Sequence, residues 1–150
     1  MAIISVKIDK SCVARIGATL EQLFDPNTRQ YMHHRLGAYF EPYVPKESGA
    51  LAQTTVATSD YLEYTQKEYA HYQYEGIVYG PNCPIRENGI IIGWYSPVAH
   101  KHPTDRFLSH SNSLNPRATA HWDVVAMAEH STDFADDVAR YVANRFNAGG

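Results

Sequence analysis

The histidines are the residues of this chain best suited to binding a metal ion, and there are eight of them among 150 residues. His100 and His102 alternate, so both rings would point to the same side of an extended segment, where His110 or His71 could complete a site. The chain lacks the His-Glu-x-x-His and Cys-x-x-Cys spacings that mark many zinc sites. We therefore expect polar histidines in a surface loop, with a small metal-dependent enzyme as the alternative.

Side chains that could act as nucleophiles or as acid–base pairs lack the motifs that would activate them. Ser48 is not in a Gly-x-Ser-x-Gly elbow, and Cys83 lies between Asn82 and Pro84 without a local base motif. Asp136 and Asp137 are adjacent and would diverge on a helix, which favours solvated acids over a catalytic pair. The chain also has no glycine-rich phosphate loop. The sequence thus predicts a protein that is not an enzyme and has no cofactor.

Tyrosine is the unusual residue type, with eleven copies against five phenylalanines. Stacking on single-stranded nucleic acid would need interleaved basic residues, but Lys67 is the one Lys or Arg between residues 61 and 79. Two interpretations remain open, a cross-strand aromatic core and a protein interface. Six of the tyrosines fall in this stretch: Tyr61, Tyr64, Tyr69, Tyr72, Tyr74 and Tyr79.

The overall composition is that of one ordinary globular domain spanning residues 1–150, with 44% hydrophobic and 19% charged residues. The net charge of −3 argues against a protein that grips duplex nucleic acid, so we expect no sequence-specific nucleic-acid partner. Cys12 and Cys83 fit a reducing compartment. No apolar run is long enough to span a membrane, and the first residues do not resemble a secretory signal.

Periodicity predicts the elements that would position these residues. Asp25 followed by Pro26 predicts a helix start, and Asn115 and Ser131 are further candidate N-caps. Gly37 predicts a close approach by another element. The expected fold is α+β, a twisted antiparallel sheet with N-terminal helices and a C-terminal helix packed on one face. The expected strands are 2–8, 51–58, 61–65 and 90–95, and the expected helices are 12–24, 27–42 and 117–146, the last in one or two pieces.

Residues 97–116 show no clear period and are expected to form a long loop or arm, while 147–150 would fray. Residues 68–74 predict a single helical turn or an irregular edge segment.

Three segments resemble a known protein family. Residues 42–54 contain Val-Pro-x-x-x-Gly-x-Leu, residues 68–76 contain Tyr-Ala-x-x-Gln-Tyr-x-Gly, and residues 116–128 contain an Ala-x-x-x-Trp helix start. Their order and spacing are similar to those of minor capsid proteins of tailed phages and prophages. That family is similar in organisation to the neck, or tail-completion, proteins that join head to tail.

The resemblance implies a structural virion protein at the neck or top of the tail, assembled in the host cytoplasm. It implies a homo-oligomeric ring, for which the sixfold character of tails favours a hexamer, with a dodecamer as the alternative. The expected neighbours are connector or stopper proteins on one side and tail-terminator or tail-tube proteins on the other. A tail-terminator ring is the alternative function.

The interface of such a ring is expected on exposed polar and aromatic elements, chiefly the tyrosine stretch and the 97–116 loop. Tyrosine and arginine dominate interface energetics, and two apolar side chains at the centre of a polar loop would otherwise remain in water. The candidate interface residues are Tyr72, Tyr74, Arg86, Arg106, Phe107 and Leu108.

Overall fold

The computed structural model of the chain describes residues 20–46, 55–65, 67–95, 97, 99, 101–110 and 112–147. The expected strand 2–8, Cys12, Ser48 and His100 lie outside these residues. Of the expected helix 12–24, the described part is the short α2 (Leu20–Leu23). Helices and antiparallel strands together make an α+β fold, as the sequence predicts. None of the described helices is long and apolar enough to cross a membrane.

Helix α3 (Pro26–Phe40) begins where the sequence predicts. Asp25 has extended backbone angles, and its Oδ1 accepts a hydrogen bond from the Thr28 backbone N–H at 3.0 Å, while Pro26 occupies the first helical position. A short 3₁₀ segment, η1 (Glu41–Tyr43), continues the helix before Pro45. Gly37 permits the close approach that its position predicts, because a Cβ there would lie 3.4 Å from Leu62 Cδ1.

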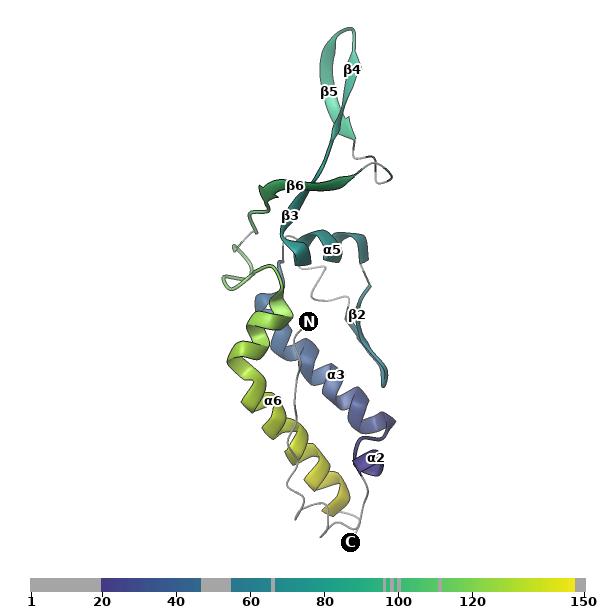
Figure 1. Ribbon diagram of the computed structural model, residues 1–150, viewed down its shortest axis with the longest axis vertical. Helices are drawn as coiled ribbons and strands as arrows, with labels where there is room; N and C mark the ends of the chain where they lie inside the picture. The colour runs from purple at the N-terminus through teal and green to yellow at the C-terminus, as the bar shows by residue number, and fades with distance from the viewer. Residues whose placement is uncertain are drawn as a thin grey trace.

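Helix α6 (Trp122–Asn147) is one continuous helix that runs antiparallel to α3 (Figure 1). Their ends are tied by Arg145, which pairs with the Asp25 carboxylate and donates to Thr28 Oγ1 at 3.0 Å. Farther along the pair, Tyr31 and Tyr141 stack with ring centroids 3.9 Å apart. The expected C-terminal helix is thereby confirmed in one piece, over residues 122–147 rather than 117–146.

Two apolar clusters lie along the α3–α6 contact. The first joins Phe40, Tyr43 and Val44 to Ala70 and the beginning of α6, namely Trp122, Ala126 and Met127. The second joins Leu23 to Phe134, Val138 and Val142. Each large side chain buried in this way contributes about 1.5–3 kcal/mol relative to exposure. The helix pair is therefore the most extensively buried part of the described structure.

The strands form three two-stranded antiparallel ladders rather than the single expected sheet. The first pairs β1 (Thr55–Ala57) with β2 (Leu62–Tyr64) and lies against α3, where His33 Nδ1 is 2.7 Å from the Thr58 carbonyl oxygen. The second pairs β3 (Ile77–Gly80) with β6 (His102–Phe107). The third pairs β4 (Cys83–Glu87) with β5 (Ile90–Tyr95). The expected strands 61–65 and 90–95 are confirmed, and within the expected strand 51–58 residues 55–57 form a strand.

Helix α5 (Lys67–Glu75) forms where the sequence predicts one turn or an irregular segment, and it is a full helix. It ends at Gly76, whose φ of +66° reverses the chain direction into β3. The Gly76 backbone N–H donates to Tyr72 O at 3.1 Å, and its carbonyl accepts from Leu108 N–H at 2.9 Å. Gly76 thus joins α5 to the end of the β6 strand.

Two expected N-caps are wrong. Asn115 does not begin a helix: its side chain is buried, and its Nδ2 donates to the carbonyls of Glu41 and Val44, each at 2.8 Å. The helix begins seven residues later at Trp122, after His121 with its positive φ of 47°. Ser131 does not begin a helix either. It is an exposed residue in the middle of α6, whose apolar stripe continues past it. The 97–116 loop is also shorter than expected, since residues 102–107 are strand β6.

Candidate functional site

The most prominent surface feature is the projecting hairpin, which consists of β4, β5 and the turn between them (residues 83–95). Asn88 and Gly89 have φ values of 50° and 81°, the two positive angles that a type I′ turn requires. Arg86 Nη1 donates to Gly89 O across the turn at 3.5 Å. Figure 1 shows this hairpin extending beyond the helices, at the end of the molecule opposite α2.

The register of the hairpin distributes its side chains over two faces. Side chains of β4 alternate, so Pro84 and Arg86, with their partners Trp94 and Ile91, lie on the first face. Ile85 and Glu87, with their partners Gly93 and Ile90, lie on the second face with Tyr95, and Ile92 is the extra residue of a bulge in β5. Both faces are apolar, and each has one charged side chain near the turn.

The apolar side chains of β5 are strongly exposed. Ile90 is 69% exposed, and Ile92 and Trp94 are each 60% exposed. We call these three residues the exposed stripe. Ile85, Ile91 and Tyr95 are also largely open to solvent. A two-stranded hairpin is marginal in water by itself, and contiguous apolar surface on a soluble protein marks an interaction site. The hairpin is therefore the described surface best suited to contact another protein.

A groove of about 720 Å³ lies at the foot of the hairpin, between it and the β3–β6 ladder. Its apolar lining comes from β3 and the base of the hairpin, and its polar lining comes from alternate residues of β6. Asp105, between two of these β6 residues, does not line the groove. The residues that define the groove are Val78, Tyr79, Pro81 and Trp94 on the apolar side and His102, Thr104 and Arg106 on the polar side.

Four of the six candidate interface residues lie near this hairpin and groove. Arg86 is exposed on the hairpin, and Arg106 is exposed on β6 with its side chain lining the groove. Phe107 is 84% exposed at the end of β6, opposite Ile77 in the ladder. Leu108 is half-buried beside Tyr72 and Ile77. The expectation that residues 104–110 contact another chain stays a prediction.

The two candidate tyrosines differ in their surroundings. Tyr72 is half-buried, with its ring 4.9 Å from the Tyr79 ring and Lys101 Nζ 5.6 Å above it. Tyr74 packs edge-on against Trp122 at 5.0 Å, and its hydroxyl donates to Asp123 Oδ1 at 2.9 Å. Burial, reinforced by that hydrogen bond, raises the pKa of Tyr74 to about 12. Tyr74 thus helps to hold α5 against α6, as a core aromatic would.

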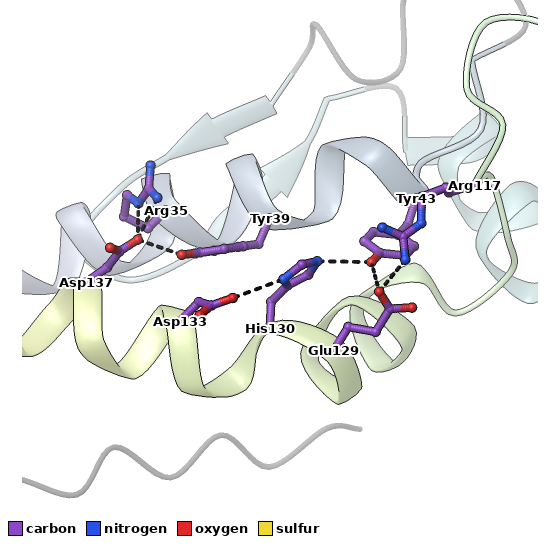
Figure 2. A network of polar contacts seen from close by, with 8 residues as sticks. All are labelled: Arg35, Tyr39, Tyr43, Arg117, Glu129, His130, Asp133 and Asp137. Carbon is purple, nitrogen blue, oxygen red and sulfur yellow. Dashed lines mark hydrogen bonds and ion pairs between the residues drawn. The ribbon is translucent and has the colours of Figure 1, made fainter.

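A polar network between α3 and α6 brings several titratable groups together (Figure 2). Tyr43 donates to Glu129 Oε2 at 2.7 Å, and His130 Nε2 lies 3.1 Å from the same hydroxyl. Asp133 Oδ2 is 3.4 Å from His130 Nδ1, which gives an acid–histidine–hydroxyl series. Tyr43 is nonetheless only 1% exposed, and its proton is held by Glu129, so the series connects helices rather than presenting a nucleophile.

The other end of the network corrects an expectation about Asp137. Asp137 is not a solvated acid, because its Oδ2 accepts from Arg35 Nη2 at 2.6 Å and from the Tyr39 hydroxyl at 2.7 Å. The Tyr39 hydrogen bond and the Arg35 guanidinium hold the pKa of Asp137 below its usual range. Its neighbour Asp136 is exposed. The pair diverges as the sequence predicts, but one member stabilises the helix pair.

The histidines considered for a metal site are spread through the structure. His102 lines the groove, His71 packs beside Tyr79, and His110 Nδ1 is 2.9 Å from Gln73 Oε1. Burial lowers the pKa of His110, which favours its neutral form. Among the described residues, no three His, Cys, Asp or Glu side chains are grouped closely enough to hold a metal ion.

Sequence reasoning missed the hairpin and its groove, although one signal for the hairpin was present. Asn88-Gly89, directly before the β-rich run 90–95, is the usual sequence of a two-residue hairpin turn. Strand β6 was harder to find, because His-Pro-Thr-Asp-Arg-Phe has neither alternating hydrophobicity nor many β-branched residues. The groove depends on that strand, so it could not be predicted without it.

Comparisons with known proteins return no match to this chain, whether against family models, curated proteins or solved structures.

Proposed function

We propose that this chain is a structural virion protein of a tailed phage, one that forms a neck or tail-completion ring between the portal–connector complex and the tail. The motif order in residues 42–54, 68–76 and 116–128 supports the family. The observation that carries the proposal is the projecting hairpin, because a large apolar surface held away from the helices suits a protein that is completed by its neighbours.

The ring would consist of copies of this chain, with six favoured and twelve as the alternative, and it would contact connector or stopper proteins and tail-terminator or tail-tube proteins. The buried Tyr43 hydroxyl and the satisfied polar network support a structural role over a catalytic one. The protein would then act without turnover and without a cofactor. A tail-terminator ring has similar requirements, so the position of the ring in the particle decides between the two.

The test is to locate the chain in purified virions by quantitative mass spectrometry and antibody labelling. We expect a small fixed number of copies, with the label at the head–tail junction. Label at the junction between the terminator and the tube would favour the tail-terminator role, and virions without this chain would exclude both. Elemental analysis of the purified protein addresses the enzyme alternative, for which a stoichiometric metal is the expected sign.

A further inference from the structure

We propose that the tip of the projecting hairpin of one copy binds in the groove of a second copy, with Glu87 facing Arg106 across the contact. This inference rests on the proposed function, because it names the surfaces through which ring subunits meet. It concerns two exposed parts of one molecule that carry opposite charges at Glu87 and Arg106.

The hairpin supplies the inserting surface. Its second face presents Ile85, Ile90 and Tyr95, with Glu87 opposite Ile90 at the turn end, so an apolar strip ends in a carboxylate. Arg86 belongs to the first face and would not enter the same contact. Isoleucine side chains are rigid at χ1, so burying them removes little conformational freedom.

The groove supplies the receiving surface. Val78, Tyr79 and Pro81 give it apolar walls, while Arg106 and His102 lie along its β6 side. Asp105 does not line the groove, so Arg106 is the fixed charge of the groove. An apolar strand that ends in a carboxylate matches this lining in both hydrophobicity and charge.

The occupant is a second copy because the hairpin cannot fill its own groove. Trp94 lines the groove, and Ile90 lies four residues farther along the same strand, about 13 Å away at ~3.4 Å per residue. A hydrogen-bonded ladder does not fold back over that length. Because the inserting and receiving surfaces are different parts of the chain, successive copies can join head to tail and close as a ring. Two copies can also exchange hairpins reciprocally.

The test uses charge reversal in the full chain, with association measured by sedimentation equilibrium. We expect Glu87→Arg and Arg106→Glu each to weaken association at least tenfold, because each places like charges together in the contact. The double variant should return to within about threefold of the original Kd, and an equimolar mixture of the two single variants should associate better than either alone.

Two reversals serve as matched controls, Arg86→Glu on the first face of the hairpin and Asp105→Arg at a β6 residue that does not line the groove. Both should leave the Kd within about threefold, and all the altered side chains are exposed, so thermal melting should show intact folding. The inference is overturned if Arg106→Glu has no effect, if the double variant is not rescued, or if the wild-type chain stays monomeric up to about 1 mM.

The size of the assembly separates this inference from the proposed function. Charge rescue of a dimer with no larger species would support the hairpin contact and count against the ring. A ring whose stability is unchanged by either reversal would support the ring and overturn the hairpin contact.

Discussion

At the scale of single residues, the buried polar groups show what holds the chain together. Asn115 is 6% exposed, and its amide donates to two carbonyls at the end of α3 and in the segment after it. This one side chain therefore fixes the loop before α6 to the η1 segment. The buried Asn115 amide makes both of its donated hydrogen bonds, which stabilises the fold. Without this amide the two carbonyls would lose their donor, and this would cost free energy of folding.

Replacement of that side chain gives the first prediction. Asn115→Ala leaves the Glu41 and Val44 carbonyls without their donor, and we expect the free energy of unfolding to fall by about 2–3 kcal/mol. The measurement is urea unfolding followed by circular dichroism. Asn112→Ala, at an exposed position three residues earlier, is the matched control and should change the free energy by less than about 0.5 kcal/mol. Equal effects from both variants would contradict the role of Asn115.

Acid sensitivity is the second prediction. The hydrogen bond from Arg145 and the Thr28 N–H hold the pKa of Asp25 far below its usual range, and the pKa of Asp137 is also lowered. Because the folded state favours the charged carboxylates, their contribution is present above their unfolded pKa values, near ~4, and is lost as pH falls through the folded values. Unfolding free energy should therefore decrease progressively below about pH 4.

Asp25→Asn isolates part of this effect, since asparagine is an equally good N-cap but cannot pair with Arg145 as a charge. We expect the variant to be less stable at pH 7 and to lose less stability between pH 7 and pH 3, as measured by thermal melting. An unchanged pH dependence would show that the Asp25–Arg145 pair contributes nothing to the loss of stability at low pH.

At the scale of elements, local patterns predict some pieces and long-range pairing decides the rest. The Asp25-Pro26 start of α3, the apolar stripe of α6 and the β-rich run 90–95 are local signals, and all three are present. The single expected sheet is not, because the partners of each strand depend on contacts far apart in sequence, such as Ile77 with Phe107. Asn115-Pro116 looks like a helix start, but the amide of Asn115 is taken by carbonyls some 70 residues earlier.

The junction between α5 and β3 gives the third prediction. A Cβ at Gly76 would lie 2.7 Å from Ala120 Cβ, and φ is +66°, so Gly76→Ala combines a steric clash with backbone strain. We expect a loss of about 2–4 kcal/mol in unfolding free energy. Gly89→Ala is the control, since its φ is +81° but no atom lies within 4 Å of the added Cβ. That variant should cost only the strain, about 1–2 kcal/mol.

Comparable losses from both glycine variants would show that strain alone matters at Gly76 and that the approach of Ala120 is unimportant. Differential scanning calorimetry of the two variants at equal concentration distinguishes the outcomes.

At the scale of the whole molecule, the buried core and the exposed apolar surface lie toward opposite ends of an extended shape (Figure 1). The α3–α6 pair carries the two apolar clusters at one end, and the projecting hairpin carries exposed apolar residues at the other. Stability and assembly should therefore respond to different substitutions.

This separation is the fourth prediction. The double variant Ile90→Thr, Ile92→Thr removes apolar area from the exposed stripe. We expect it to change the unfolding free energy of the monomer by less than about 1 kcal/mol. We also expect virions complemented with this variant to lose infectivity. Phe134→Ala is the contrasting variant: its side chain is fully buried against α3, and we expect a loss of about 3–5 kcal/mol. If the hairpin variant instead unfolds the monomer, the hairpin belongs to the core and not to an interface.

The central claim, that this chain forms a ring at the head–tail junction, is tested most directly by a cryo-EM map of the neck of the purified virion. We predict a closed ring of copies of this chain, six favoured, with the hairpin of each subunit covered by protein and Phe107 losing exposed area. A neck map that accounts for all its density without this chain, or that shows the hairpin of every copy standing free in solvent, would contradict the account.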